Sequence, residues 1–205
     1  IKVMAKDGYL NSSRQWCYNR NGTEEVWFNI GDEKPITMSD GENLTLQIYD
    51  FNHDDKVDGG KASFTFGLKN LTKQTSEMAN LYGLTRWVGS TMRDTTIPQI
   101  HDKLSSELKR CIVEVYKKSI ESASSSNIVT SIDKLWLFSC SEVGGKTDNP
   151  YALEGTIYPI FTDDNSRLKY NSKGTASNWF TRSAWRSDNY DSYMWVVTNS
   201  GGVTN

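Results

Sequence analysis

The order of apolar and polar residues predicts a β-rich N-terminal half. The segments "LTLQIYD" (44–50) and "ASFTFGL" (62–68) alternate apolar with polar positions and are rich in β-branched and aromatic residues, as strands are. Turn signals at Gly31-Asp32 and Asp40-Gly41 divide the preceding stretch into further strand segments. We therefore expect strand, loop and strand around residues 44–68.

Helices are predicted in two places. Residues 8–21, "GYLNSSRQWCYNRN", indicate a cap and a short helix. From residue 76 to 118 apolar residues recur at helical spacing, and Pro98 is expected to separate one short helix from the next. Residues 105–107, "SSE", are typical of a helix start, whereas the β-branched content of "CIVEVYKK" (111–118) favours a strand.

The last third of the chain is aromatic and rich in loops. Residues 119–131 form a polar, Ser-rich bridge that predicts an exposed loop, and residues 134–139, "KLWLFS", give the strongest strand pattern of the chain. After residue 139 only "YMWVV" (193–197) reads clearly as a strand. No internal repeat is visible.

Composition favours one domain. A chain of 205 residues is long enough to bury a substantial core without disulfides. Aromatic residues make up 12%, with seven Trp and ten Tyr, and such large amphipathic rings line either a core or a binding face. We expect a single domain over residues 1–205.

Charge and hydropathy exclude two classes of partner. The formal net charge is −2, and Lys and Arg do not cluster with aromatics, so nucleic acid is not an expected partner. No apolar run approaches the roughly 20 residues of a membrane-spanning helix, so no membrane span is expected in this segment.

The cysteines predict no metal site of their own. Cys17, Cys111 and Cys140 contain no C-x-x-C pair, which excludes a standard zinc or iron–sulfur site built from cysteines alone. Buried free thiols are favoured over one disulfide plus an unpaired thiol. A cysteine nucleophile would need one of only two histidines, His53 or His101, and is not favoured.

The segment "DFNHDDKVDGGK" (50–61) raises the question of calcium. Four oxygen-bearing residues fall at D-x-N-x-D-x-x-x-D, the spacing of an EF-hand-type loop, namely Asp50, Asn52, Asp54 and Asp58. However, the sixth position is Asp55 where Gly is needed, and the twelfth is Lys61 where Glu is needed.

The alternative interpretation is a turn between two strands. Asn52 and Asp54 would then bond backbone donors as Asx turns do, and His53 would cap or pack. Calcium stays open as the one cofactor considered, because backbone carbonyls and water can complete its shell. The E-P-N and W-N-D signatures of calcium-dependent lectins are absent from the sequence; "DNP" (148–150) is the nearest approach.

Six motifs in order resemble a family of bacterial and phage domains of unknown function. They read "GDEKPITM", "QIYDFNHDDKVDGGKASFTFGLKNL", "RWVGSTMRDTTIPQIHDKLSSELKRCIVEVYKKS", "DKLWLFSCSEV", "YALEGTIYPIF" and "NWFTRSAW". The resemblance covers nearly the whole chain. The family's usual closing motif is W-W-L-R-S-P, whereas residues 179–184 lack the second Trp and the Pro. The chain also stops at Asn205, before the expected terminal strand, which implies either a missing strand or an open sheet edge.

The resemblance implies an α+β, C-type-lectin-like fold, similar to sulfatase-modifying enzymes and phage tropism determinants. In that fold a small mixed or antiparallel sheet and short helices support long C-terminal loops. The family has no known activity, so function has to be argued from the site. It also implies that the domain belongs to a longer surface or phage protein and works extracellularly, at a cell surface or on a phage particle.

The expected ligand-binding residues lie between the closing motif and the last strand. Rings that stack and planar polar groups that hydrogen-bond suit contact with a carbohydrate or a protein. The candidates are Trp185, Arg186, Asn189, Tyr190, Asp191 and Tyr193. The alternative is that half of these rings belong to the core. Strand alternation would place Tyr193, Trp195 and Val197 on one face and Met194 and Val196 on the other.

Other candidates are given structural roles. Trp179 and Arg182 are expected to hold loops together. A structural role is also favoured over a binding role for Trp87 and Arg93. The ring of Trp87 is expected to pack inward, and Arg93 is expected to bond the end of a short helix to a neighbouring loop.

Catalysis is not expected. Glycoside hydrolysis needs two carboxylates at a fixed separation, and nothing in the sequence brings any two of Glu142, Glu154 and Asp133 together. The sequence therefore predicts a binding module without catalysis, with an enzyme on the same fold or a structural spacer as alternatives.

Overall fold

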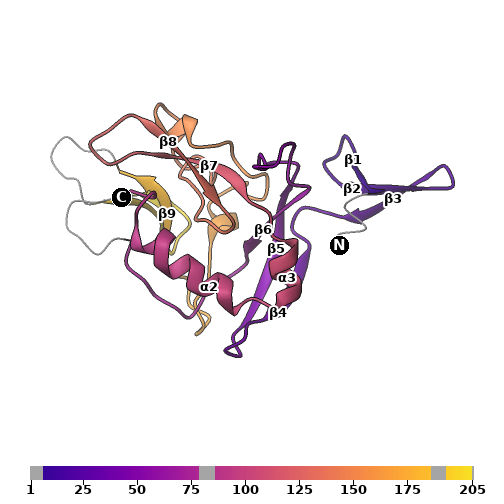
Figure 1. Cartoon of the computed structure of the whole chain (residues 1–205), viewed down its shortest axis with the longest axis horizontal. Coiled ribbons are helices and arrows are strands. Elements are labelled where there is room, and N and C mark those ends of the chain that lie inside the picture. Colours follow the sequence, from indigo (N-terminus) through magenta and orange to yellow (C-terminus); the bar gives the residue numbers. More distant parts are fainter. Residues whose placement is uncertain (1–6, 79–85, 186–192, 205) are drawn as a thin grey trace.

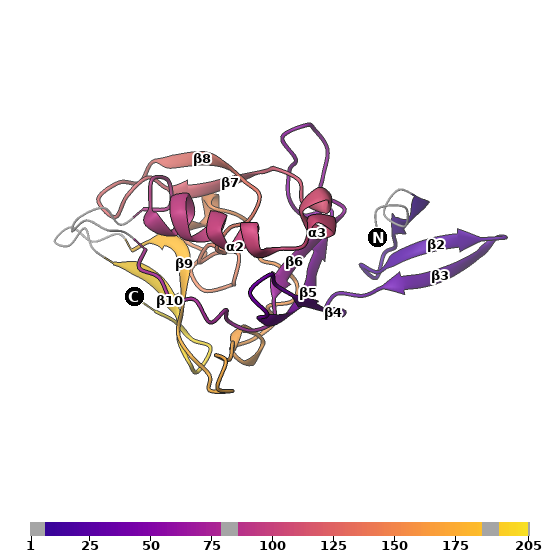
Figure 2. The same ribbon diagram turned by 60° about the horizontal axis from the view of Figure 1, so that its bottom comes forward.

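The computed structural model describes residues 7–78, 86–185 and 193–204, and these form a rounded body with one small sheet projecting from it (Figure 1). The projecting sheet is antiparallel, in the order β1-β2-β3, and is built from Tyr9–Leu10, Trp16–Arg20 and Thr23–Phe28. It stands beside the body in both ribbon views (Figure 2).

The helix predicted for residues 8–21 is wrong, because this segment forms β1 and β2. Arg20 pairs with Thr23, so that Asn21 and Gly22 alone make the turn, both with positive φ (53° and 83°). Asn-Gly favours this two-residue hairpin turn, since both residues tolerate positive φ. Across the hairpin the rings of Tyr18 and Trp27 stack, with centroids 4.7 Å apart.

The first sheet of the body joins β4 (Glu33–Thr37), β5 (Asn43–Phe51) and β6 (Phe64–Leu68), all antiparallel. The predicted strand, loop and strand over residues 44–68 is confirmed. Asp40 and Gly41 turn the chain between β4 and β5, with φ of 82° at Gly41.

Three short helices cross the body. The π-helix η1 (Met92–Thr96) runs directly into α2 (Ile97–Lys103), and α3 follows over Ser106–Cys111. Pro98 therefore does not separate two helices; it occupies the first turn of α2, where its missing N–H has no partner to lose. The predicted start of α3 is confirmed, because Ser105 Oγ accepts a hydrogen bond from the Leu108 amide at 3.2 Å.

The strand predicted after residue 111 is confirmed, whereas the one over residues 134–139 is wrong. β7 (Val115–Ile120) pairs with β8 (Ile128–Asp133), which occupies the end of the predicted Ser-rich loop. Residues 134–139 follow β8 without joining a sheet. Their apolar side chains are partly or fully buried, and the carbonyls of Leu137 and Phe138 accept hydrogen bonds from Arg182.

The C-terminal segment contains two 3₁₀ turns, Tyr151–Leu153 and Asn165–Arg167, and a second three-stranded sheet. This sheet has the order β11-β10-β9, built from Val203–Thr204, Met194–Val197 and Trp179–Ala184. The strand predicted at "YMWVV" is confirmed. A terminal strand is also present, since β11 pairs with β10.

The predicted alternation along β10 is wrong. The register with β9 shifts between Met194 and Val196, so that Met194 and Val197 are both buried while Trp195 and Val196 are intermediate. A bulge of this kind breaks strict two-residue alternation.

An aromatic core joins the two three-stranded sheets of the body. Tyr49 of β5, Phe138, Tyr158, Phe161 and Trp179 of β9 pack together with Val143 and Val197. The protein is therefore a mixed α and β fold with small antiparallel sheets and few short helices, as expected. Among the residues described, no helix is long and apolar enough to cross a membrane.

Candidate functional site

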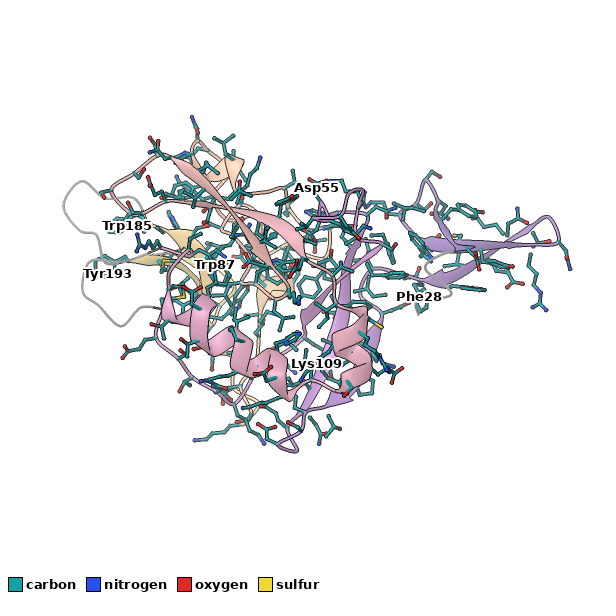
Figure 3. The ribbon with its side chains drawn as sticks, in the orientation of Figure 1. Phe28, Asp55, Trp87, Lys109, Trp185 and Tyr193 are labelled. Carbon is teal, nitrogen blue, oxygen red and sulfur yellow. The ribbon has the colours of Figure 1, made fainter. Side chains whose placement is uncertain are left out.

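An aromatic pair marks the end of the body opposite the projecting sheet. Trp185 directly follows β9 and Tyr193 directly precedes β10, and the Trp185 amide donates to the Tyr193 carbonyl at 2.9 Å. Their rings meet edge to face, with centroids 5.6 Å apart. Tyr193 is 48% exposed and Trp185 is partly exposed. Figure 3 shows the two residues side by side at this end of the body.

This pair contains two of the six predicted ligand-binding residues. Arg186, Asn189, Tyr190 and Asp191 lie outside the described residues.

Most of β9, the strand that leads to the pair, is buried. Thr181, Arg182, Ser183 and Ala184 are all 0% exposed. Trp179, at the start of β9, is also buried, and its Nε1 donates to the Arg167 carbonyl at 3.1 Å. Phe180 is the exception at 39% exposure, so β9 buries five of its six residues, and the expected structural role of Trp179 agrees with its position.

Arg182 is the central residue of a buried charge network. Nη1 and Nη2 bond the two oxygens of Glu142 at 2.5 and 2.9 Å. The guanidinium also donates to the carbonyls of Lys118, Leu137 and Glu154 at 2.8 to 2.9 Å. All five N–H donors are thus used, as expected for a residue that locks loops together.

Lys117 carries the second buried positive charge. Its Nζ donates to Asp54 Oδ1 at 2.8 Å, to Glu142 Oε1 at 2.6 Å and to Tyr158 Oη at 3.2 Å. Tyr158 Oη in turn donates to Asp54 Oδ1 at 2.8 Å, and Thr65 Oγ1 donates to Asp54 Oδ2 at 2.5 Å. Every one of these side chains is buried.

Two carboxylates of the network have pKa values far apart. Burial alone would raise the pKa of Glu142, but the charges of Arg182 and Lys117 outweigh it and hold the pKa at about 2. Burial raises the pKa of Glu154 to about 7, against the charge of Arg182 and hydrogen bonds from the Ser183 hydroxyl and the Ile120 amide. Arg182 thus bonds the carboxylate of Glu142 and the backbone carbonyl of Glu154, a proximity of the two glutamates that the sequence did not reveal.

Asp133 does not join them. Its carboxylate accepts hydrogen bonds from Trp87 Nε1 at 3.1 Å, Arg93 Nε at 2.8 Å and Ser131 Oγ at 2.6 Å. Trp87 is 0% exposed, and Arg93 also donates to the Ile132 carbonyl at 3.2 Å. Trp87 and Arg93 therefore have the structural roles that the sequence favoured.

The four residues at calcium-loop spacing point to different partners. Asp50 binds Arg14 and His53 Nδ1, the latter at 2.7 Å, whereas Asp54 belongs to the network around Lys117. Asp58 is 77% exposed and pairs with Lys56.

Asn52 adopts positive φ (50°) in the turn. In the part of the chain that is described, no group of three or more His, Cys, Asp and Glu is arranged to hold a metal ion. Calcium binding by this loop stays the untested alternative to a turn.

The turn interpretation holds in part. The carboxylate that bonds a nearby backbone amide is that of Asp50, which accepts from Phe51, and not that of Asp54. His53 packs as expected, with its ring 3.9 Å from the ring of Tyr158.

His53 also links two other side chains in a short hydrogen-bonded chain. Its Nδ1 contacts Asp50 Oδ2 at 2.7 Å, and its Nε2 lies 3.3 Å from Oγ1 of the exposed Thr156. The arrangement is hydroxyl, imidazole and carboxylate in sequence, the order used when histidine activates a hydroxyl group. Sequence reasoning did not select Thr156, because no local pattern relates it to His53.

The prediction of buried free thiols is confirmed for Cys17 and Cys140 and is wrong on burial for Cys111. All three cysteines are unpaired; Cys17 and Cys140 are buried, whereas Cys111 is exposed. Burial raises the pKa of Cys140 to about 12, so this thiol is not activated.

Comparison with known proteins gives one match. No curated protein and no solved structure matches the chain. A family model described as a domain of unknown function, DUF6273, matches residues 62–205. The match begins just before β6 and includes Lys117, Glu142, Glu154 and Arg182, whereas Asp54 lies ahead of it although it bonds Lys117. Because the matched region is well over half of the chain, the protein belongs to this family of domains of unknown function.

Proposed function

We propose that the protein is an extracellular ligand-binding module that recognises a glycan through the surface around Trp185 and Tyr193. The observation that carries this proposal is the edge-to-face pair of these two rings at the exposed end of β9 and β10. Aromatic rings stack on the apolar faces of sugars while their polar atoms, and neighbouring polar side chains, bond hydroxyl groups.

Rigidity behind the pair supports a binding role. The strand that leads to Trp185 is held by Arg182, whose five hydrogen bonds reach β7, residue 137, Glu142 and Glu154. A contact surface on a rigid element loses little conformational entropy when it binds. The sequence between the two rings, "RSDNYDS" (186–192), adds the polar and aromatic side chains that such a surface uses.

The proposal also includes the fold type, the kind of parent protein and the location that the sequence resemblance implies. These are a C-type-lectin-like core, membership of a longer bacterial surface or phage protein, and work outside the cell. Three features of the structure support the proposed fold type. The sheets are small and antiparallel, the helices are short, and the long segment from residue 134 to 178 contains no strand of a sheet. An experimental structure superposed on C-type lectins would test it directly.

The test of function is binding of the labelled domain to a broad glycan and mucin array, run with calcium and with EDTA. We expect binding that EDTA does not change and that Trp185→Ala and Tyr193→Ala abolish. Tyr170→Ala is the matched control, because Tyr170 is also exposed (41%) but lies outside the β9–β10 sheet. No glycan binding, or binding that survives both ring substitutions, would contradict the proposal; capture of a surface protein instead would identify the other ligand class.

A second candidate function is hydrolysis at His53. The alignment of Asp50, His53 and Thr156 supports it, since a histidine oriented by a carboxylate can activate a neighbouring hydroxyl. If it is correct, the domain hydrolyses simple esters, and Thr156→Val and His53→Ala both abolish the activity while His101→Ala does not. Esterase activity that persists in Thr156→Val would exclude this candidate.

A further inference from the structure

We propose that Lys117 and Asp54 become joined by an amide bond between Nζ and the side-chain carboxyl carbon, formed within the folded chain. Lys117 Nζ lies 2.8 Å from Asp54 Oδ1, and both side chains are nearly inaccessible, at 4% and 3% exposure. The two residues come from distant parts of the sequence, the loop after β5 and the middle of β7, and the fold holds them in contact. Such enforced proximity replaces a bimolecular encounter by an intramolecular one.

The surroundings exclude water and are aromatic. Lys117 Nζ lies 4.8 Å from the ring centroid of Trp136 and 5.6 Å from that of Tyr158. Glu142, Thr65 and Tyr158, which complete the contacts, are all buried. In a dry interior a proton transfer that turns an ammonium and a carboxylate into an amine and an acid removes two buried charges. The neutral amine is the nucleophile, and the neutral acid is the electrophile.

The neighbouring groups match the needs of the reaction. Thr65 Oγ1 donates to Asp54 Oδ2 at 2.5 Å, where negative charge develops when Nζ attacks the carboxyl carbon. Tyr158 Oη lies 2.8 Å from Oδ1 and 3.0 Å from Oδ2, so its single proton can turn from the first oxygen to the second as that charge forms. Glu142 Oε1 accepts from Nζ at 2.6 Å and is therefore placed to take a proton from the attacking nitrogen and return it to the departing oxygen. The Lys117 charge is one of the two that lower the pKa of Glu142, and the first proton transfer to Asp54 removes it, so the carboxylate becomes a stronger base at this step.

The step balances without any other reactant. The ammonium group begins with three protons. One passes to Asp54 Oδ1 along the existing hydrogen bond, and a second passes through Glu142 to the same oxygen, which leaves as water. The third remains on the amide nitrogen. The Nζ–Cγ bond forms, the Cγ–Oδ1 bond breaks, one positive and one negative charge disappear, and nothing is oxidised or reduced.

The other buried lysine provides an internal comparison. Lys169 Nζ donates to Tyr49 Oη at 2.7 Å and to the Leu68 carbonyl, and no carboxylate of the described residues contacts it. It therefore lacks the electrophile, although it too is buried, at 7% exposure against 4% for Lys117. Burial of a lysine is thus common to both sites, and the carboxyl partner distinguishes them.

The experiment is the intact mass of the complete chain, measured under denaturing conditions after purification and after prolonged incubation. We expect the mass to be lower than that of the sequence by one water molecule, and a proteolytic digest to contain one branched peptide that joins the segments carrying Asp54 and Lys117. An unchanged mass after incubation, or a digest with these segments separate, would overturn the proposal, and this result needs no variant to fold.

Variants distinguish the proposed amide bond from another reaction that also removes one water molecule from the chain. Asp58-Gly59 is a sequence at which an exposed aspartate can cyclise on the backbone and lose the same mass. We expect Lys117→Arg to have the full mass of its sequence, whereas Asp58→Ala and the matched buried variant Lys169→Arg keep the deficit. A deficit that persists in Lys117→Arg, or that disappears in Asp58→Ala, would assign the lost water elsewhere and contradict the proposal.

Discussion

Arg182 and Glu142 form a two-bond ion pair in the interior of the protein, with the side chains 0% and 1% exposed. A lysine cannot reproduce the planar fork of the guanidinium or its further bonds to three carbonyls. We expect Arg182→Lys to lower the free energy of unfolding by about 3–5 kcal/mol, because it leaves buried acceptors without donors. Urea denaturation checks this value, and Arg20→Lys on the exposed end of β2 should change stability by less than about 0.5 kcal/mol.

Glu154 makes stability depend on pH in an unusual direction. Burial raises its pKa to about 7, above the ordinary value of a glutamate in the unfolded chain. The folded state therefore holds a proton that the unfolded state releases, and the contribution to stability is full below about pH 4.5 and is lost as the pH rises to 7 and beyond. The loss is on the order of 3 kcal/mol.

Denaturation midpoints between pH 5 and 8 measure this effect. Glu154→Gln keeps the size of the side chain and should remove most of the decline. A wild-type midpoint that stays constant over this range would show that Glu154 ionises normally.

The sequence predicts those elements whose signals are local. Strands β5 and β6 were predicted from their alternating apolar and polar residues, although β5 buries both faces, with Tyr49 in one core cluster and Ile48 in another. Ser105 caps α3 through an amide only three residues away. The hairpin of β2 and β3 was missed although Asn21-Gly22 is a strong local turn signal. The apolar side chains of residues 134–139 are partly or fully buried, as such a run indicates, but the segment does not pair with a strand. Arg182 bonds the carbonyls of Leu137 and Phe138 instead.

The buried network has no such local signal. Asp54, Lys117, Glu142 and Arg182 lie on four separate segments, and their contacts span 25 to 63 residues along the chain. Only the structural role of Arg182 was expected. The contact between the rings of Trp185 and Tyr193 was not predicted, although both residues were selected as ligand-binding candidates.

Replacing Trp179 with alanine should destabilise the fold far more than replacing Tyr193 with alanine. Trp179 is buried in the aromatic core, so Trp179→Ala should destabilise the fold by about 3–5 kcal/mol. Tyr193 is 48% exposed, and Tyr193→Ala should cost about 1 kcal/mol or less. Thermal melting of the two variants checks the difference. A large loss in Tyr193→Ala would show that this ring supports the fold, which would count against its role in binding.

EDTA should leave the melting temperature unchanged. Both oxygens of Asp50 and of Asp54 already accept hydrogen bonds from side chains of the protein, and Asp58 points to Lys56. A cation in this loop would have to displace those partners. Melting in calcium and in EDTA, for the wild type and Asp58→Ala, tests this expectation. A melting temperature that rises in calcium and loses that rise in Asp58→Ala would establish a calcium site.

Lys169 should destabilise the protein at neutral and acidic pH. Burial lowers its pKa to about 7, below the ordinary lysine value near 10.5. The unfolded state therefore binds a proton that the folded state releases, so this contribution rises as the pH increases from about 7 to 10.5. Lys169→Met should abolish that rise and raise the free energy of unfolding at pH 6 by about 1–3 kcal/mol, since it removes a charge buried without a counter-ion in the described residues.

The Leu68 carbonyl keeps a donor in this variant, because Tyr49 Oη bonds it at 2.9 Å. Lys173→Met on the exposed loop nearby is the matched control and should alter neither quantity; a destabilised Lys169→Met at pH 6 would instead show that the amine stabilises the core through its bonds to Tyr49 and Leu68.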